Sequence, residues 1–499
     1  MENSLYNTIA DRLIKQIKDG VYNSGDKLLS VRAMAKQQGV SVSTILAAYA
    51  ILEDRGFAEV RPKSGYYVHR PKPKAHKPPP KVQGDCCQPI KPSKAQRIME
   101  VMQDGANPKF INFSSAIADS DFPITNQLKK AFSSVVRTQK FVGIGYDAVQ
   151  GSETLRREIA KRAMDGGILA SPDEIVITAG CQNALDLALR TLTKPGDIIA
   201  VETPCYYGLL QLIESYGLKA IEIPADATTG MSIDALQLAL EQWPIKAVIS
   251  IPSYNNPFGS VMPDAHKQQL IELINQHELY LIEDDVYAEL GYSNKRPKAI
   301  KSFDTQGRVL LCSSVSKTLD PGMRVGWIIP GLHLDKVQHL QFVSNVAVSR
   351  LPQLVTAQII SRGSYDRHLR LAREAYRQRR DQLLDLIDAH FPEDTRVSKP
   401  QGGFVLWVQL PKAIDTSQLY DEAREQGVSI SPGDIFSLDG KYHSCIRLTY
   451  AESWSDKRIT AIRVLGGLIN QRLQKALSAW IITHISIGIM SRKRQRRFN

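Results

Sequence analysis

The side chain in this sequence that most directly suggests covalent chemistry is a lysine placed among hydroxyl groups. Lys317 lies just beyond the apolar run RVLLC, with Ser314 and Ser316 before it and Arg324 seven residues after it. An amine in such a position can form a Schiff base with an aldehyde, while hydroxyls and a guanidinium group can hold a phosphate. The spacing by itself also fits a solvated lysine and a structural arginine.

The full string SSVSKTLDPGMRVGW closely resembles the Schiff-base segment of fold-type I pyridoxal-phosphate (PLP) enzymes of the class I/II aminotransferase group. The resemblance implies that PLP is bound through Lys317, and that an acid beside the pyridine nitrogen keeps the ring protonated as an electron sink. The stretch LYLIEDDVYAEL supplies Asp284 for this role and Tyr287 as a donor to the ring oxygen O3′. The Asp-x-x-Tyr spacing of the family favours Asp284 over Asp285.

Two turns match further positions of the same family. Asn256, in NNPFG, would share O3′ with the tyrosine, although N-P-x-G by itself is simply a turn. Gly180, Cys181 and Gln182 begin a predicted helix, whose backbone N–H groups would bind the phosphate. The family often has Ser or Thr where this chain has Cys181, but the backbone contacts need no particular side chain.

Three more residues correspond to ligand contacts in that family. Tyr206, in ETPCYYG, occupies the position of an aromatic residue that stacks on the cofactor ring. Tyr146 matches a tyrosine that reaches the phosphate across a dimer interface, and Arg447 matches an arginine that clamps the α-carboxylate of a substrate or effector. The alternatives are a core tyrosine for Tyr206 and a surface ion pair for Arg447.

The elements that must position these residues are short apolar strands alternating with helix-length stretches between residues 110 and 474. The strands are EIVITAG, DIIAVE, KAVISIP, LYLIEDD and RVLLCSS. This alternation predicts an α/β domain with a mainly parallel sheet. The resemblance to fold-type I PLP transferases adds a smaller C-terminal α+β subdomain.

Residues 1–70 have a different pattern. Leu5, Ile9, Leu13 and Ile17 lie on one helical stripe, a second helix begins near Ser30, and a third begins after Ser41 with an interior face of Ile45, Ala48, Tyr49 and Leu52. Two short strands then flank the turn Pro-Lys-Ser-Gly. This order is typical of an α+β winged helix-turn-helix, although a three-helix protein–protein module has similar spacing.

The stretch from Ser24 to Val68 resembles the GntR-type winged helix throughout, and departs from it at Leu29, where that family usually has Pro. We expect the third helix to enter the DNA major groove with the wing beside it. The predicted DNA contacts are Arg32, Ser41, Ser43, Thr44, Arg61, Lys63 and Gly65.

The net charge of +12 on 499 residues also suggests a nucleic-acid partner. Residues 1–60 are neutral, however, whereas residues 61–109 carry +8 and residues 491–499 carry +5. We predict a Pro/Lys-rich linker over 71–109 and an apolar, then basic, C-terminal extension of unknown role over 475–499.

A cytoplasmic protein without a membrane attachment fits the remaining features. The polar N-terminus is no signal peptide, and the apolar run 476–490 is shorter than the roughly 20 residues of a membrane span. None of the six cysteines forms a C-x-x-C pair, so we predict no metal site.

A GntR-type domain, a linker and an aminotransferase-like domain in one chain resemble the MocR/GabR group of bacterial transcription regulators. The resemblance implies a homodimer that binds DNA and senses a small amine, an amino acid or PLP itself through Schiff-base chemistry. An active PLP-dependent aminotransferase with an accessory DNA-binding head is the alternative, because it would use the same site residues.

Overall fold

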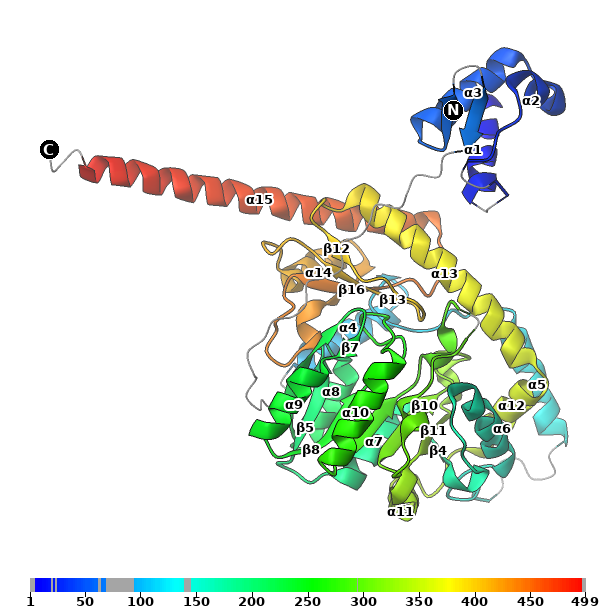
Figure 1. Cartoon of the computed structure of the whole chain (residues 1–499), viewed down its shortest axis with the longest axis vertical. Coiled ribbons are helices and arrows are strands. Elements are labelled where there is room, and N and C mark those ends of the chain that lie inside the picture. Colours follow the sequence, from blue (N-terminus) through cyan, green and yellow to red (C-terminus); the bar gives the residue numbers. More distant parts are fainter. Residues whose placement is uncertain are drawn as a thin grey trace. The chain divides into compact units, whose positions relative to one another are not determined.

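The computed structural model describes residues 5–18, 21–22, 25–61, 64–68, 94–138, 145–293 and 295–495, with side chains up to residue 478. The chain divides into two compact units, Met1–His76 and Lys77–Asn499. Figure 1 traces their elements along the sequence. The predicted DNA contact Lys63 and most of the predicted linker lie outside the described residues.

The N-terminal unit consists of three helices and a β-hairpin, in the order that the sequence predicts. The elements are α1 (Leu5–Lys18), α2 (Val31–Gln38), α3 (Val42–Asp54), β1 (Ala58–Arg61) and β2 (Gly65–Val68), and the two strands pair antiparallel. Ser30 and Ser41 each accept a hydrogen bond from the backbone N–H group three residues on. These caps fix where α2 and α3 begin.

The interior face of α3 is the centre of this unit. The four side chains predicted to be buried there, from Ile45 to Leu52, are all inaccessible to solvent. The hydroxyl of Tyr49 also donates to the backbone carbonyl of Leu29 at 2.8 Å. A tertiary hydrogen bond therefore holds the backbone before α2 at the position where GntR-type domains usually have Pro.

The larger unit is built on an eight-stranded sheet with the order β4-β11-β10-β9-β8-β5-β6-β7. The run from β10 through β9, β8 and β5 to β6 is parallel, whereas β11 and β7 are antiparallel to their neighbours. This confirms the mainly parallel sheet. The strands are β4 (Val176–Thr178), β5 (Ile198–Thr203), β6 (Lys219–Asp226), β7 (Gly230–Met231), β8 (Ile245–Ser250), β9 (Tyr280–Asp284), β10 (Val309–Ser314) and β11 (Gly326–Ile329).

Helices cover both faces of this sheet, because successive residues of a strand point to opposite sides. On β5, Ile199 and Val201 pack in one cluster with α7, α8 and α11, whereas Ala200 packs in another with α9 and α10. Figure 1 shows these helices around the central strands. Their bounds are α7 (Cys181–Leu192), α8 (Tyr207–Ser215), α9 (Ile233–Gln242), α10 (Asp264–Gln276) and α11 (Leu334–Asn345).

The C-terminal part of the chain forms the expected smaller α+β subdomain. Its antiparallel sheet has the order β12-β13-β16-β15, and a separate parallel pair joins β14 to β3. The strands are β3 (Ile111–Asn112), β12 (Arg396–Val397), β13 (Val405–Gln409), β14 (Val428–Ser429), β15 (Ser431–Pro432) and β16 (Cys445–Thr449). The remaining helices are α4 (Ala95–Ala106), α5 (Ile124–Thr138), α6 (Glu153–Ala163), α12 (Arg350–Ser361), α13 (Ser364–His390), α14 (Thr416–Glu425) and α15 (Asp456–Gln495).

The linker prediction is wrong for residues 95–106, which form helix α4. Ile98 and Val101 give α4 an apolar face that is buried in the core of the larger unit. The buried carboxylate of Asp104 accepts hydrogen bonds from Tyr420 at 2.5 Å and Arg424 at 2.7 Å, both on α14. The abundant Pro and Lys just before this helix concealed its short apolar stripe.

Helix α15 continues without a break past residue 475, where we predicted a separate extension to begin. The boundary in the sequence pattern is therefore not a boundary in secondary structure. Within the part of the chain that the structure describes, no helix is both long and apolar enough to cross a membrane.

Candidate functional site

All but two of the predicted ligand-binding residues, Gly180 and Tyr146, line one cavity of about 190 Å³ at the carboxyl ends of the parallel strands. Asp284 ends β9, Ser314 ends β10, and the N-terminus of α7 lies at the same edge. Ligands in open α/β sheets bind at this edge, because loops there meet from several strands. The predicted residues that line the cavity are Cys181, Gln182, Tyr206, Asn256, Asp284, Tyr287, Ser314, Ser316, Lys317, Arg324 and Arg447.

Lys317 is partly buried in the cavity wall, and the loss of contact with water there lowers the pKa of its amine to about 8. Burial is the largest cause, and the nearby positive charge of Arg447 is the next. The amine donates a hydrogen bond to the carbonyl oxygen of Ala116 at 2.5 Å. A lowered pKa leaves more of the amine neutral near pH 7, and the neutral form is the nucleophile in Schiff-base formation.

Asp284 lies in the same cavity with few groups to stabilise its charge. Its carboxylate accepts hydrogen bonds from the backbone N–H of Val286 at 3.2 Å and from the thiol of Cys181 at 3.4 Å. Burial raises its pKa to about 6 in spite of these bonds. Such a carboxyl group gains most from a bound cationic or N–H partner.

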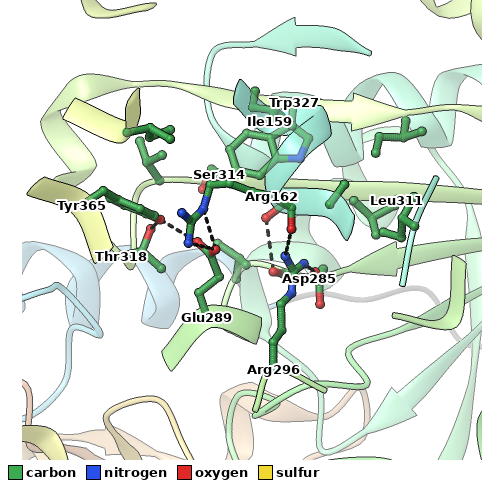
Figure 2. A pocket seen from close by; sticks show the side chains of 17 residues that line it. Ile159, Arg162, Asp285, Glu289, Arg296, Leu311, Ser314, Thr318, Trp327 and Tyr365 are labelled. Carbon is green, nitrogen blue, oxygen red and sulfur yellow. Dashed lines mark hydrogen bonds and ion pairs between the residues drawn. The ribbon is translucent and has the colours of Figure 1, made fainter. Parts of the chain in front are cut away.

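Asp285 turns to a second, much smaller cavity of about 20 Å³. Figure 2 shows two largely buried ion pairs beside this smaller cavity: Arg296 contacts Asp285 at 2.5 Å, and Arg162 contacts Glu289 at 2.5 Å. Adjacent carboxylates on the same strand end therefore face different surroundings. Asp284 lines the main cavity, whereas Asp285 lines the smaller one and forms an ion pair with Arg296.

Several polar atoms in and around the main cavity have no hydrogen-bond partner among the described residues. They are the hydroxyl of Tyr287, the hydroxyl of Ser316 and Nε of Arg447. The other guanidinium nitrogens of Arg447 donate to Asn256 at 3.4 Å and to Ser431 at 2.9 Å. These three residues line one cavity, so a polar ligand bound there would supply the partners that the three atoms lack.

At the predicted phosphate-binding end of the cavity, a backbone turn lies close to a guanidinium group. Gly180 has a φ of +91°, and a Cβ added there would lie 2.6 Å from Nη2 of Arg324. Arg324 also donates to the carbonyl of Ala179 at 2.7 Å. The side-chain amide of Gln182 donates to the carbonyl of Gly208 at 3.0 Å. With the side-chain amide held there, the group that Gln182 presents at the start of α7 is its backbone N–H.

The two predicted tyrosines have different surroundings. Tyr206 lines the cavity, and its ring centre lies 5.1 Å from that of Tyr207. Tyr146 is 85% exposed and does not line the cavity in this chain. An exposed tyrosine is what the predicted contact with a second subunit requires.

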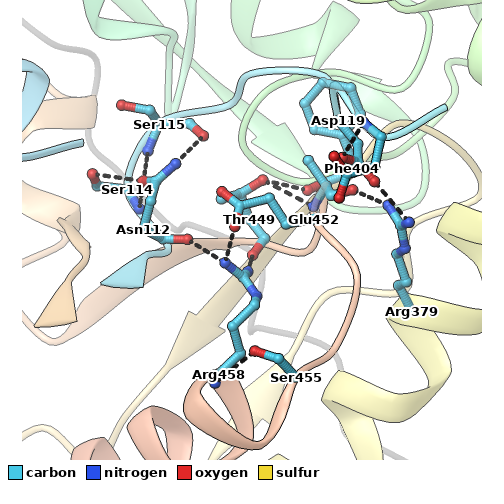
Figure 3. A network of polar contacts seen from close by, with 12 residues as sticks. Asn112, Ser114, Ser115, Asp119, Arg379, Phe404, Thr449, Glu452, Ser455 and Arg458 are labelled. Carbon is cyan, nitrogen blue, oxygen red and sulfur yellow. Dashed lines mark hydrogen bonds and ion pairs between the residues drawn. The ribbon is translucent and has the colours of Figure 1, made fainter. Parts of the chain in front are cut away.

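A polar network beside the cavity fixes the loop that carries Ala116. In Figure 3, Arg458 on α15 donates to the carbonyl of Asn112 at 3.0 Å, and Arg379 on α13 forms an ion pair with Asp119 at 2.8 Å. Helices from the end of the chain thus position a loop from its first third.

The predicted DNA contacts in the N-terminal unit lie at two places. Ser41, Ser43 and Thr44 cluster at the start of α3, with hydroxyl oxygens 2.7 to 2.8 Å from Ser41 Oγ, and Arg32 on α2 is exposed. On the hairpin, Arg61 pairs with Glu59 at 2.6 Å and lies over the ring of Tyr67.

The hairpin turn itself needs a glycine and lies close to a lysine that sequence reasoning missed. Gly65 has a φ of +113°, and the Lys27 side chain lies 3.5 Å from where a Cβ would be. Lys27 comes from the segment before α2 and forms an isolated bridge with Tyr67. This adds a basic side chain to the wing.

Comparisons with known proteins match both units. Residues 109–464 match the family described as aminotransferase class I and II, and residues 5–68 match the bacterial regulatory proteins of the gntR family. Two relatives from Escherichia coli, the uncharacterized HTH-type transcriptional regulators YjiR and YdcR, are 37% and 36% identical, each over 94% of this chain and 99% of the relative.

A solved structure agrees with the larger unit. The kynurenine aminotransferase of Pyrococcus horikoshii, crystallised with PMP, has a TM-score of 0.71 and 29% identity, covering 76% of this chain and 96% of that one. The match of both units to family models, together with the match over nearly the full length to HTH-type transcriptional regulators, decides the family. This chain belongs to the MocR/GabR-type transcription regulators.

Sequence reasoning missed one wall of the cavity in this MocR/GabR-type chain. Met102 on α4, the loop residues Ser115, Ala116 and Ile117, and Tyr207 all line it. The amphipathic stripe of α4 was the available signal, but nothing local placed it beside Lys317. The described residues of this regulator contain no group of three His, Cys, Asp or Glu side chains arranged to hold a metal ion.

Proposed function

We propose that this protein is a transcription regulator that binds PLP through Lys317 and senses a small amine or amino acid at the same site. The observation that carries the proposal is one cavity that joins a partly buried lysine of lowered pKa, an acid and two arginines. That cavity belongs to a chain whose other unit is a GntR-type winged helix.

The residues present fit PLP. Asp284 would contact the pyridine nitrogen, and Tyr287 with Asn256 would contact O3′, which would supply the partner that the tyrosine hydroxyl lacks. Bound PLP supplies an aldehyde that exchanges one amine for another. Before that exchange, the chain's own task is to keep the Lys317 amine partly buried and partly neutral.

The phosphate would lie at the other end of the cavity. Arg324, the backbone N–H groups of Gly180–Gln182 at the start of α7, and the hydroxyls of Ser314 and Ser316 would bind it. Tyr206 would lie against the ring, and Tyr146 of a second copy would complete the phosphate site in a homodimer.

Arg447 would bind the carboxylate of an amino-acid effector. It is fully buried, and Nε has no partner while the other two nitrogens are held by Asn256 and Ser431. A guanidinium group fixed in this way can pair with a carboxylate without reorganising. The effector must bind two arrangements of the protein with different affinity in order to change DNA binding.

The N-terminal unit would bind DNA in the cytoplasm. The α3 hydroxyls of Ser41, Ser43 and Thr44 would contact bases or phosphates, while Arg32 and the wing residues Arg61, Lys63 and Gly65 would contact the backbone. Lys27, close to Gly65, would add to the wing's charge.

Two measurements test the proposal. Purified protein should show visible absorbance from the Lys317–PLP linkage, and Lys317→Ala should remove it; an unchanged spectrum would contradict the cofactor assignment. A nuclease footprint on DNA upstream of the protein's own gene should change when one amine is added. Sustained amino-group transfer between common donors and keto acids, with no footprint, would favour the aminotransferase alternative.

A further inference from the structure

We infer that the effector is a neutral α-amino acid with an apolar side chain, and that Met102 on α4 determines this preference. The inference rests on the proposed function, because it concerns the same cavity. Its evidence is the set of charges in the cavity, the apolar surface beside the lysine, and the helix that supplies that surface.

Every charged side chain among the described residues of the cavity already has a role in the proposed function. Among the described residues that line the cavity, the ionised side chains are Asp284, Lys317, Arg324 and Arg447. The proposed function uses all four, for the ring nitrogen, the covalent link, the phosphate and the α-carboxylate. No charged side chain in this set remains to pair with a charge on the effector's side chain, and a buried charge without a partner is costly.

Two apolar side chains form an accessible surface in the cavity wall. Met102 and Ile117 both line the cavity, yet 42% of Met102 and 44% of Ile117 remain exposed. The hydroxyl of Tyr207 contacts Sδ of Met102 at 3.1 Å, which holds the thioether at the cavity wall. An apolar ligand side chain would cover this surface, whereas a charged one would lose water without gaining a partner.

This apolar surface lies close to the amine of Lys317. The Lys317 amine lies 2.5 Å from the carbonyl oxygen of Ala116, and Ile117 is the next residue. The apolar surface therefore begins directly beside the atom that an effector amine would replace. The α-carbon of the effector is bonded to that amine, so a side chain attached to the α-carbon can reach this apolar surface.

Hydrogen bonds to α14 hold helix α4 in place close to Met102. Asp104, two residues after Met102, is buried and receives hydrogen bonds from two side chains of α14. Met99, on the same helix, is 56% exposed and does not line the cavity. Met99→Ala is therefore a matched control for Met102→Ala, because each removes the same atoms from a partly exposed site of one helix.

The experiment is a titration of the PLP-loaded full chain, followed by its visible absorbance, with L-norleucine, L-alanine, L-glutamate and L-lysine. We expect norleucine to bind at least about tenfold more tightly than glutamate or lysine, since one apolar contact in a pocket discriminates by roughly that factor. Met102→Ala should reduce the preference for norleucine over alanine by about tenfold, and Met99→Ala should not change it. Met102→Arg should raise the affinity for glutamate.

The outcomes separate the two proposals. Tighter binding of glutamate or lysine than of norleucine, or equal effects of Met102→Ala and Met99→Ala, would overturn this inference while the proposed function stands. Absorbance that Lys317→Ala leaves unchanged would instead overturn the proposed function itself.

Discussion

The partly buried amine of Lys317 makes a quantitative prediction about the pH dependence of PLP capture. With a pKa of about 8, about a tenth of the amine is neutral at pH 7. A lysine with the ordinary pKa of 10.5 would be about 0.03% neutral at that pH, so the site raises the reactive fraction about 300-fold.

The perturbation is Arg447→Gln, which removes the largest cause of the lowered pKa after burial. The pKa of Lys317 should then rise toward its ordinary value, and each unit of that rise should slow capture at pH 7 about tenfold. PLP itself carries no carboxylate for Arg447 to bind, so this effect is separate from the proposed effector contact. Arg308→Gln, outside the cavity, is the control.

The assay is stopped-flow mixing of PLP with the cofactor-free protein between pH 6 and 10. For the unsubstituted protein, the rate should rise about tenfold per pH unit and level off above about pH 8, and Arg447→Gln should move this plateau to higher pH. A rate that continues to rise tenfold per unit up to pH 10 in the unsubstituted protein would refute the lowered pKa. An unmoved plateau in Arg447→Gln would refute the role of its charge.

Three further predictions follow from local geometry. Gly180→Ala should weaken PLP binding at least about tenfold in an equilibrium titration, because its Cβ displaces Arg324. The control is Gly196→Ala, where φ is a similar +93° and a Cβ meets nothing within 4 Å, so it should cost only backbone strain of about 1–2 kcal/mol. The raised pKa of Asp284 means that the folded state keeps a proton that the unfolded state loses, so stability falls as pH rises from 3.8 to about 6. Urea unfolding should therefore give cofactor-free Asp284→Asn a gain in free energy of unfolding, relative to the unsubstituted protein, between pH 5 and pH 8, and this gain should reach about 1.4 kcal/mol. A difference between the two proteins that stays constant over this pH range would contradict the raised pKa of Asp284. Tyr365→Phe removes a buried hydroxyl that lies 2.7 Å from the carboxylate of Glu289 and 2.6 Å from the hydroxyl of Thr318. This change should lower the free energy of unfolding by about 1–3 kcal/mol in the same assay.

The order of elements was predictable from the sequence wherever short-range patterns control structure. The start of the second helix near Ser30, the start of the third helix after Ser41 and the buried face of α3 are local features, and the structure has them as predicted. The strands that end at Asp284 and Ser314 were recognisable as short apolar runs, and parallel pairing brings their carboxyl ends to one edge of the sheet. Lys317 and Asp284 therefore line one cavity.

The errors and omissions concern contacts between distant parts of the chain. Helix α4 was assigned to the linker because its apolar stripe is short, and its stability depends on α14, which follows more than 300 residues later. Tyr49 compensates for Leu29 by a hydrogen bond across 20 residues, which no helix-start pattern could show.

By itself, the sequence determined the two fold types and the identity of the groups capable of Schiff-base, acid and anion-binding chemistry, because side-chain chemistry and periodicity are local properties. Only the tertiary structure decided how those groups behave. Burial lowers the pKa of Lys317 and raises that of Asp284, and the long-range packing of α4 brings Met102 to the cavity. Burial and long-range contacts are properties of the packed chain, so they set the site's reactivity and its selectivity for a ligand.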